Sequence, residues 1–151
     1  MWSCKAEVEV QEDKPRVLAL DVGERRIGVA VSDPTRTIAR SLCVLERRSR
    51  EEDFAAIAEL VREHQVGLVV VGHPRSMNGT IGPQARRVSR YAEALAKTLP
   101  VPLILWDERL STSTAEQLIL EAGRSARRRR KRIDAVAAAV ILQDYLDAQT
   151  S

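Results

Sequence analysis

The sequence predicts an α/β fold in which a mixed five-stranded sheet has helices on its faces. Two observations support this prediction. Three short apolar segments separated by turn residues come first, and helical and strand-like patterns then alternate along the chain. The expected order is therefore β-β-β-α-β-α-β-α-α. A dinucleotide-binding fold fits poorly, because the first strand leads into a hairpin and the chain contains no GxGxxG motif.

Short apolar segments bounded by Gly, Pro or Asp predict the five strands. We expect these strands at 16–21, 27–32, 37–45, 68–71 and 101–106. Apolar residues at helical spacing predict four helices, the first of which follows the acidic residues 51–53. The other three are expected at 83–98, 112–122 and 133–147. Tight turns between the first three strands indicate that they form an antiparallel meander.

Length and composition indicate a single domain. With 151 residues, 44% of them hydrophobic and 30% charged, the chain can bury a core and has an ordinary globular balance. We expect one domain over 15–148 and a charged, disordered extension over 1–14. No apolar segment approaches the ~20 residues that cross a bilayer, and the first residues lack the apolar core of a secretory signal. We therefore expect a cytoplasmic protein without a membrane partner.

The positive charge is concentrated late in the chain. The formal net charge is only +3, but the segment 123–132 (GRSARRRRKR) contains seven basic residues and no acid. We expect it to be a loop that binds phosphate, with an affinity that is largely independent of sequence and falls with salt. The residues assigned to this role are Arg127, Arg128, Arg129, Arg130, Lys131 and Arg132. A solvated run of charge is the simpler interpretation.

Acidic residues occupy three places from which carboxylates are usually excluded. Asp21 ends the first strand, and Asp107 and Glu108 end the fifth. Asp134 opens the last helix on its apolar stripe. An inward carboxylate is costly unless it is paired, hydrogen-bonded or bound to a cation. Converging carboxylates bind Mg²⁺ or Mn²⁺ through oxygen, and two such ions stabilise the attacking and leaving oxygens of a phosphodiester. The pattern thus indicates a metal-dependent hydrolase.

Each acid also has a simpler interpretation. Asp134 is a suitable helix cap, Asp21 a suitable turn residue, and Asp107 or Glu108 a suitable ion-pair partner for Arg109. Their joint occurrence favours the metal site. Because successive strand residues point to opposite faces, only one of Asp107 and Glu108 is expected to share that site with Asp21. We favour Glu108, whose longer side chain reaches further inward, and Asp107 is the second candidate.

Four motifs resemble those of one protein family, in the same order and with the same spacing. They are LDVGERRIGVAVSD at 20–33, VVGHP at 70–74 with MNGTIG at 77–82, DERLST at 107–112, and IDAVAA at 133–138. Over about 16–147 the chain is thus similar to the YqgF/RuvX family. The resemblance implies an RNase H-like fold and a metal-dependent nuclease that acts on structured nucleic acid. Members are described as Holliday-junction resolvases and as nucleases that mature the 5′ end of 16S ribosomal RNA.

The resemblance also implies which residues are functional. By match to the motifs, the catalytic acids are Asp21, Glu108 (or Asp107) and Asp134. The metal ligands for Mg²⁺ or Mn²⁺ are then Asp21, Glu108 and Asp134. His73 departs from the family pattern, which has leucine between Gly and Pro, and we expect a tolerated substitution in a loop.

Two further segments are candidates for contact with nucleic acid. The glycine-rich loop at 77–82 offers Asn78, Gly79 and Thr80 to a phosphate, although a plain connection to the next helix is an equally simple interpretation. We expect Arg86, Arg87 and Arg90 to extend a phosphate track along that helix, and Arg86 and Arg90, four residues apart, share a face of it. Arg109 follows the fifth strand. Aromatic residues make up only 3% of the chain, so recognition by base stacking is not expected. Duplex or branched substrates suit this surface better than single strands.

Together these features predict a phosphodiesterase that acts on a ribosomal RNA precursor or on branched DNA. The ribosome is a further candidate partner, and a monomer and a homodimer are both compatible with the sequence. The main alternative is a non-catalytic nucleic-acid-binding or recruiting protein with the same fold. A nucleotide-binding module of the actin-like kind would need a second phosphate-binding half and far more than 151 residues.

Overall fold

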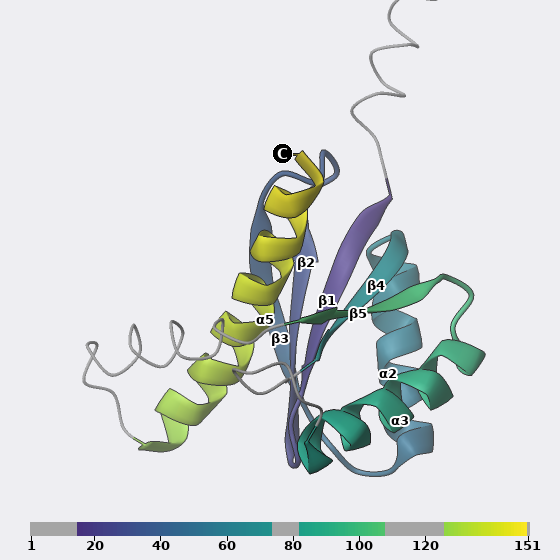
Figure 1. The fold of residues 1–151 in the computed structure, drawn as a ribbon, viewed down its shortest axis with the longest axis vertical. Coiled ribbons are helices and arrows are strands. Elements are labelled where there is room, and N and C mark those ends of the chain that lie inside the picture. Colours follow the sequence, from purple (N-terminus) through teal and green to yellow (C-terminus); the bar gives the residue numbers. More distant parts are fainter. Residues whose placement is uncertain (1–14, 74–81, 108–125, 151) are drawn as a thin grey trace, which may run out of the picture.

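The computed structural model describes residues 15–73, 82–107 and 126–150, and for 126–135 and 150 it describes the backbone alone. Three strands come first: β1 (Arg16–Val22), β2 (Arg26–Ser32) and β3 (Ala39–Glu46). They are followed by α2 (Arg50–Glu63), β4 (Val66–His73), α3 (Pro83–Thr98), β5 (Leu103–Asp107) and α5 (Ala126–Thr150) (Figure 1). The predicted order is confirmed over these residues, and the helix expected at 112–122 lies outside them.

The strands form one mixed sheet in the order β3-β2-β1-β4-β5. The first three make an antiparallel meander, whereas β4 pairs with β1 and β5 pairs with β4 in parallel. The carboxyl ends of β1, β4 and β5 therefore lie at one edge of the sheet, which we call the carboxyl edge. Asp21, His73 and Asp107 lie at or next to these strand ends.

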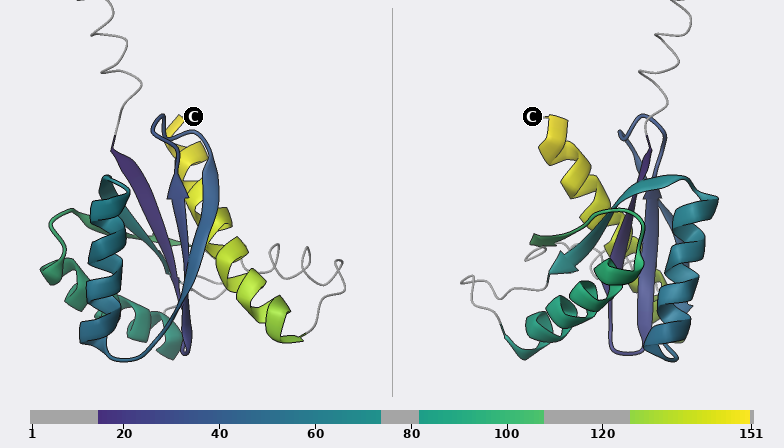
Figure 2. Two further views of the ribbon diagram at one scale, coloured as in Figure 1. Left: turned by 180° about the vertical axis from the view of Figure 1, so that it is seen from behind. Right: turned by 90° about the vertical axis from the view of Figure 1, so that its right-hand side faces the viewer.

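Helices cover both faces of the sheet. α2 and α3 pack on one face, and α5 crosses the other face diagonally (Figures 1 and 2). Alternate residues of β1 divide between the two faces, as the pleat requires. Leu18, Leu20 and Val22 join the core beneath α2 and α3, while Val17 and Ala19 join the core beneath α5.

Two strand boundaries differ from the prediction because local hydrogen bonds take precedence over apolar character. β3 begins at Ala39 and not at Thr37, since the backbone N–H groups of Thr37 and Ile38 donate to Asp33 Oδ1 within the preceding turn. β5 begins at Leu103, directly after Pro102, which has no backbone N–H for the sheet. β4 is longer than expected at both ends and includes His73, so the prediction that His73 lies in a loop is wrong.

The last helix begins earlier than its apolar stripe suggested. α5 starts at Ala126, so the basic block is helical and the prediction of a basic loop is wrong. Arginine and lysine are good helix formers, and the apolar turns that follow extend the helix without interruption. Asp134 therefore lies inside α5, and its interpretation as a helix cap is wrong as well. No helix in the described part of the chain is long and apolar enough to cross a membrane.

Candidate active site

Asp21 lies at the carboxyl edge, on the central strand of the sheet. It is the residue before the last of β1 and pairs with Gly28 of β2. By alternation it belongs to the same face as Val17 and Ala19, beneath α5, and its side chain is half-buried. Directly after the strand, Gly23 N–H donates to Arg26 O over 2.8 Å. A β-carbon at Gly23 would lie 2.9 Å from that oxygen, so this tight hairpin requires glycine.

Asp107 lies on the opposite face from Asp21. It is the last residue of β5, and by alternation along the strand it points to the same face as Leu103, which packs with α2 and α3. Its register partner on β4 is His73, which is only 5% exposed. The His73 Nε2 atom lies 2.9 Å from the Oγ atom of Ser89 on α3, so this histidine also points to the α3 side. Asp107 and His73 thus face away from the α5 side.

The side chains of the remaining predicted acids lie outside the described part of the structure. Glu108 and Arg109 lie outside the described residues, as do Asn78, Gly79 and Thr80. Asp134 and the basic residues 127–132 are described as helix backbone only. Among the side chains that are described, no three acidic, histidine or cysteine residues group together in a way that would hold a metal ion.

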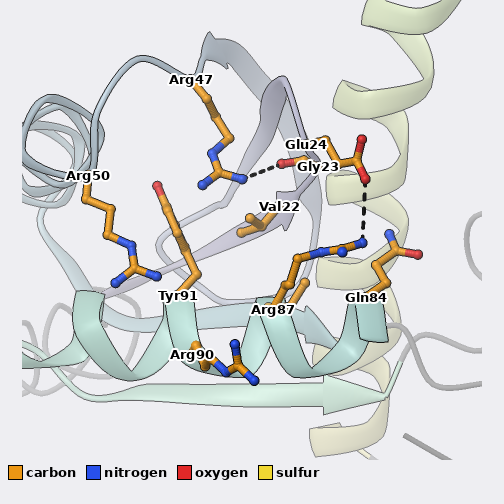
Figure 3. A pocket seen from close by; sticks show the side chains of 10 residues that line it. Val22, Gly23, Glu24, Arg47, Arg50, Gln84, Arg87, Arg90 and Tyr91 are labelled. Atoms are coloured by element: carbon orange, nitrogen blue, oxygen red, sulfur yellow. Dashed lines mark hydrogen bonds and ion pairs between the residues drawn. The ribbon is translucent and has the colours of Figure 1, made fainter. Parts of the chain in front are cut away.

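A basic pocket opens at the same edge, on the α2 and α3 side of the sheet (Figure 3). Its volume is about 320 Å³. It is lined by Val22, Gly23, Glu24, Arg47, Arg50, Gln84, Arg87, Val88, Arg90 and Tyr91. Four of these residues are arginines, which come from the β3–α2 connection, the first turn of α2 and the middle of α3. We call this cavity the arginine pocket.

The wall of the arginine pocket is held by the buried carboxylate of Asp53, which is 5% exposed. Asp53 accepts hydrogen bonds from the Arg48 N–H at 3.0 Å and from the Tyr91 hydroxyl at 3.2 Å. Its Oδ2 atom lies 3.7 Å from Arg47 Nε, and Arg47 also donates to Gly23 O at 2.9 Å. Burial and the adjacent Asp53 carboxylate raise the pKa of Tyr91, so the phenol stays protonated. Arg47 is thus fixed between the hairpin and α2.

The sequence pattern predicts only part of this pocket. It points to Arg86, Arg87 and Arg90 as a phosphate track, and of these Arg87 and Arg90 line the pocket. It does not single out Arg47 or Arg50, and it treats Asp53 only as part of an acidic helix start. The one feature of the sequence that points to this pocket is Asp53. This acid immediately precedes Phe54, the first apolar residue of the helical pattern, so it lies next to the buried face of the helix.

Comparison with known proteins places this geometry in a family. The family model described as "RuvX: Holliday junction resolvase" matches residues 15–148. The chain belongs to the RuvX family. It is 46% identical over 135 residues to a protein of Thermoanaerobacter pseudethanolicus, a match that covers 89% of this chain and 97% of the relative. A relative from Symbiobacterium thermophilum is 52% identical over 136 residues, which are 90% of this chain and 94% of that protein. Both relatives are named "Putative pre-16S rRNA nuclease".

Solved structures agree on the fold of this RuvX family member. Thermus thermophilus RuvC bound to a Holliday junction superposes with a TM-score of 0.55 at 15% identity, covering 91% of this chain and 96% of that one. The fowlpox virus resolvase bound to junction DNA gives 0.51 at 10% identity, covering 90% and 99%. The α/β, RNase H-like fold is confirmed, and so is the family resemblance that predicted a nuclease.

Proposed function

We propose that this RuvX family protein is a metal-dependent nuclease that hydrolyses phosphodiester bonds in structured nucleic acid. Residues 15–148, the span of the family match, are then its single nuclease domain. The names of its relatives make the 16S ribosomal RNA precursor the first candidate substrate, and the family description makes a four-way DNA junction the second. The observation that carries the proposal is the half-buried carboxylate of Asp21 at the end of the central strand. We further propose that the protein is cytoplasmic and acts on ribosome precursors.

We propose Asp21, Glu108 and Asp134 as the metal ligands. Glu108 is favoured over Asp107 because Asp107 belongs to the face of α2 and α3, away from Asp21. Position 134 precedes Ala138 by four residues on α5, and Ala138 is fully buried against the sheet. It therefore falls on the helical stripe that faces Asp21's side of the sheet.

The donor chemistry of this set suits hard divalent cations. Carboxylate oxygens are the ligands that Mg²⁺ and Mn²⁺ prefer, and no thiolate or imidazole is among the three. When bound, such ions supply an activated water and stabilise the negative charge that develops on the phosphate oxygens. The protein holds Asp21 on a rigid central strand, where the strand fixes the position of the carboxylate. The basic first turns of α5 and the segment 78–80 would hold the flanking phosphates.

The experiment is cleavage of a labelled 16S precursor RNA and a labelled four-way DNA junction, each with Mg²⁺, Mn²⁺ or EDTA. We expect cleavage that needs the metal and is lost in Asp21→Asn and Glu108→Gln. Asp107→Asn is the matched control, because it removes an equivalent charge one residue away on the other face, and we expect a much smaller effect. Equal loss in Asp107→Asn and Glu108→Gln would contradict the proposed ligand set.

The alternative, a recruiting protein that binds nucleic acid without cutting it, is favoured by one feature. The arginine pocket and the basic start of α5 provide binding surfaces that need no metal. This alternative predicts no cleavage of either substrate in any metal, with affinity that is unchanged in Asp21→Asn. The same assay with a parallel binding measurement therefore separates the two functions.

A further inference from the structure

We propose that the arginine pocket binds a backbone phosphate of the nucleic-acid substrate and anchors the strand on the side of the sheet opposite to the cleavage site. This inference rests on the proposed function, because it takes nucleic acid as the substrate. It adds Arg50 as a binding residue beside Arg87 and Arg90, to which the sequence already pointed, and it places the fixed guanidinium group of Arg47 in the wall of the site. Neither the family match nor the motifs assign a role to this pocket.

The charges of the pocket favour an anion. Arg47 is compensated by the buried Asp53, and Arg87 lies 3.5 Å from Glu24, in an exposed pair of little energetic value. Within the described residues, Arg50 and Arg90 have no ion-pair partner, although both line the pocket. Two uncompensated guanidinium groups around one cavity create a positive potential. Guanidinium groups also match the geometry of phosphate oxygens better than lysine does.

The pocket is built in advance of binding. Arg47 is held by Asp53 and by Gly23 O, and its guanidinium carbon lies 4.6 Å from the centre of the Tyr91 ring. The Tyr91 ring is in turn fixed edge-on against Phe54, with the ring centres 5.1 Å apart. Figure 3 shows Arg47, Arg50 and Tyr91 on one side of the opening, and Arg87 and Gln84 on the other. The Arg47 and Tyr91 wall of the pocket therefore loses little side-chain entropy when the site binds a ligand.

The same packing excludes recognition of a base. Tyr91 is the aromatic residue of the pocket, and it is only 2% exposed. Arg47 and Arg50 lie over the ring, at 4.6 and 6.0 Å from its centre, and Phe54 packs against it in a T-shaped contact, so no stacking platform is available within this pocket. The remaining polar groups are arginines, one glutamine and one glutamate. This composition suits a backbone phosphate, which the pocket would bind whatever the identity of the base.

The position of the pocket fits a strand that also reaches Asp21. Gly23 and Glu24 line the pocket and follow Asp21 by two and three residues. Two residues of extended chain span about 7 Å. One strand of a duplex carries a phosphate about every 3.4 Å along the helix axis. A strand whose scissile phosphate lies at Asp21 would therefore pass the pocket within a few nucleotides.

The test is equilibrium binding of a labelled duplex in EDTA, so that cleavage plays no part. We compare the intact protein with the double variant Arg50→Gln/Arg90→Gln, which breaks no ion pair in the described part of the chain. Removal of two charged hydrogen bonds should weaken binding about tenfold or more at low salt. The slope of log K against log salt should become shallower by up to about 0.9 for each phosphate that the variant no longer binds.

The matched control is Arg62→Gln/Lys97→Gln. It removes the same charge from the same two helices, at their far ends, together with one exposed ion pair of little energetic value, Arg62 with Glu59, and should leave affinity and salt slope nearly unchanged. Circular dichroism melts check that both double variants fold. A second measurement scans neutral methylphosphonate linkages along one strand. We expect one or two positions that weaken binding to the intact protein and have no effect on the Arg50→Gln/Arg90→Gln protein.

Equal weakening in both double variants would show a general effect of net charge and overturn the proposal. Tight binding of inorganic phosphate or a mononucleotide to the pocket, with duplex affinity unchanged in Arg50→Gln/Arg90→Gln, would assign the pocket to a small phosphate compound and also overturn it. If the pocket variants lose affinity while no substrate is cut in any metal, the phosphate site stands and the proposed nuclease fails. The two proposals are therefore tested separately.

Discussion

The two faces of the sheet are built from different kinds of residue. Beneath α2 and α3 the core consists mainly of large side chains, among them Leu18, Leu20, Ile57, Phe54 and Leu95. Beneath α5 it is thinner and contains three small residues, Ala19, Ala30 and Ala138, all of which are fully buried. Small residues let α5 approach the strands closely, whereas large ones hold α2 and α3 further away.

Because of this difference, the two faces present different chemical groups at the carboxyl edge of the sheet: the proposed carboxylate ligands on one face and the arginine pocket on the other. On the thin face, Asp21 lies beside a closely packed helix that carries Asp134. On the thick face, the gap left between the hairpin, α2 and α3 forms the arginine pocket. The arrangement suggests that one face of the carboxyl edge cuts a strand and that the other holds it. Each prediction below tests one side of this division.

The largest effect is expected for Asp21→Asn, on the thin face. The substitution keeps the shape of the side chain but removes the charge that would hold divalent ions, which contribute several kcal/mol to such reactions. We expect cleavage to fall on the order of 10³-fold or more, with metal-free binding unchanged. Single-turnover cleavage and binding in EDTA measure the two quantities. A parallel loss of binding would show that Asp21 acts on affinity and not on the reaction.

The next effect concerns the wall of the arginine pocket on the thick face. Asp53→Ala leaves Arg47, the Tyr91 hydroxyl and the Arg48 N–H without their shared acceptor. We expect a loss of about 3 kcal/mol in the free energy of unfolding, because partly buried polar groups lose their partner. Urea denaturation measures it. The control is Glu52→Ala in the same helical turn, where the side chain is exposed and the cost should stay below about 1 kcal/mol.

A third prediction tests the close approach of α5. Ala138→Leu adds volume where the side chain is fully buried between α5 and the sheet, and we expect a loss of about 2 kcal/mol in stability. Because α5 also carries Asp134, cleavage should fall more than duplex binding does. Ala148→Leu is the same change at an exposed position of α5 and should be nearly neutral in both assays. A purely local defect would leave the rate of cleavage unchanged.

The smallest effect is expected at the opposite edge of the sheet, in the β2–β3 turn. Burial opposes ionisation of Asp33, but hydrogen bonds from Ile38, Thr35 and Thr37 lower its pKa to about 2. The unfolded value is about 3.9, so the stability from this group is complete above about pH 4 and is lost as the pH falls toward 2. The group is in contact with solvent, which screens its interactions, and we expect less than about 1 kcal/mol.

Asp33→Asn should therefore flatten the acid dependence of the melting temperature between about pH 4 and 2. It should leave cleavage and duplex binding unchanged, since the turn lies away from the carboxyl edge. Thermal melts over this pH range measure the first effect. An unchanged acid dependence would mean that the hydrogen bonds to Asp33 do not favour its charged form.

Sequence patterns predicted the sheet well because each strand carries its own information. Alternation and turn residues identify β1 and β2 almost to the residue, and they also indicate that Asp21 shares a face with Val17 and Ala19. The start of α5 was missed because an apolar stripe reports burial, not helix length. The basic first turns of α5 are helical without contributing to that stripe.

The sequence by itself determined the order of the elements, the family and the acids at the strand ends, since these depend on residues close together in the chain. Only the tertiary structure decided that Asp107 lies on the face opposite to Asp21, and that His73 is buried against Ser89. It alone assembled the arginine pocket, whose lining residues extend from Val22 to Tyr91. Exposed arginines have no periodicity that a sequence can reveal, because their positions are fixed by the packing of α2 and α3 and by one buried carboxylate, Asp53.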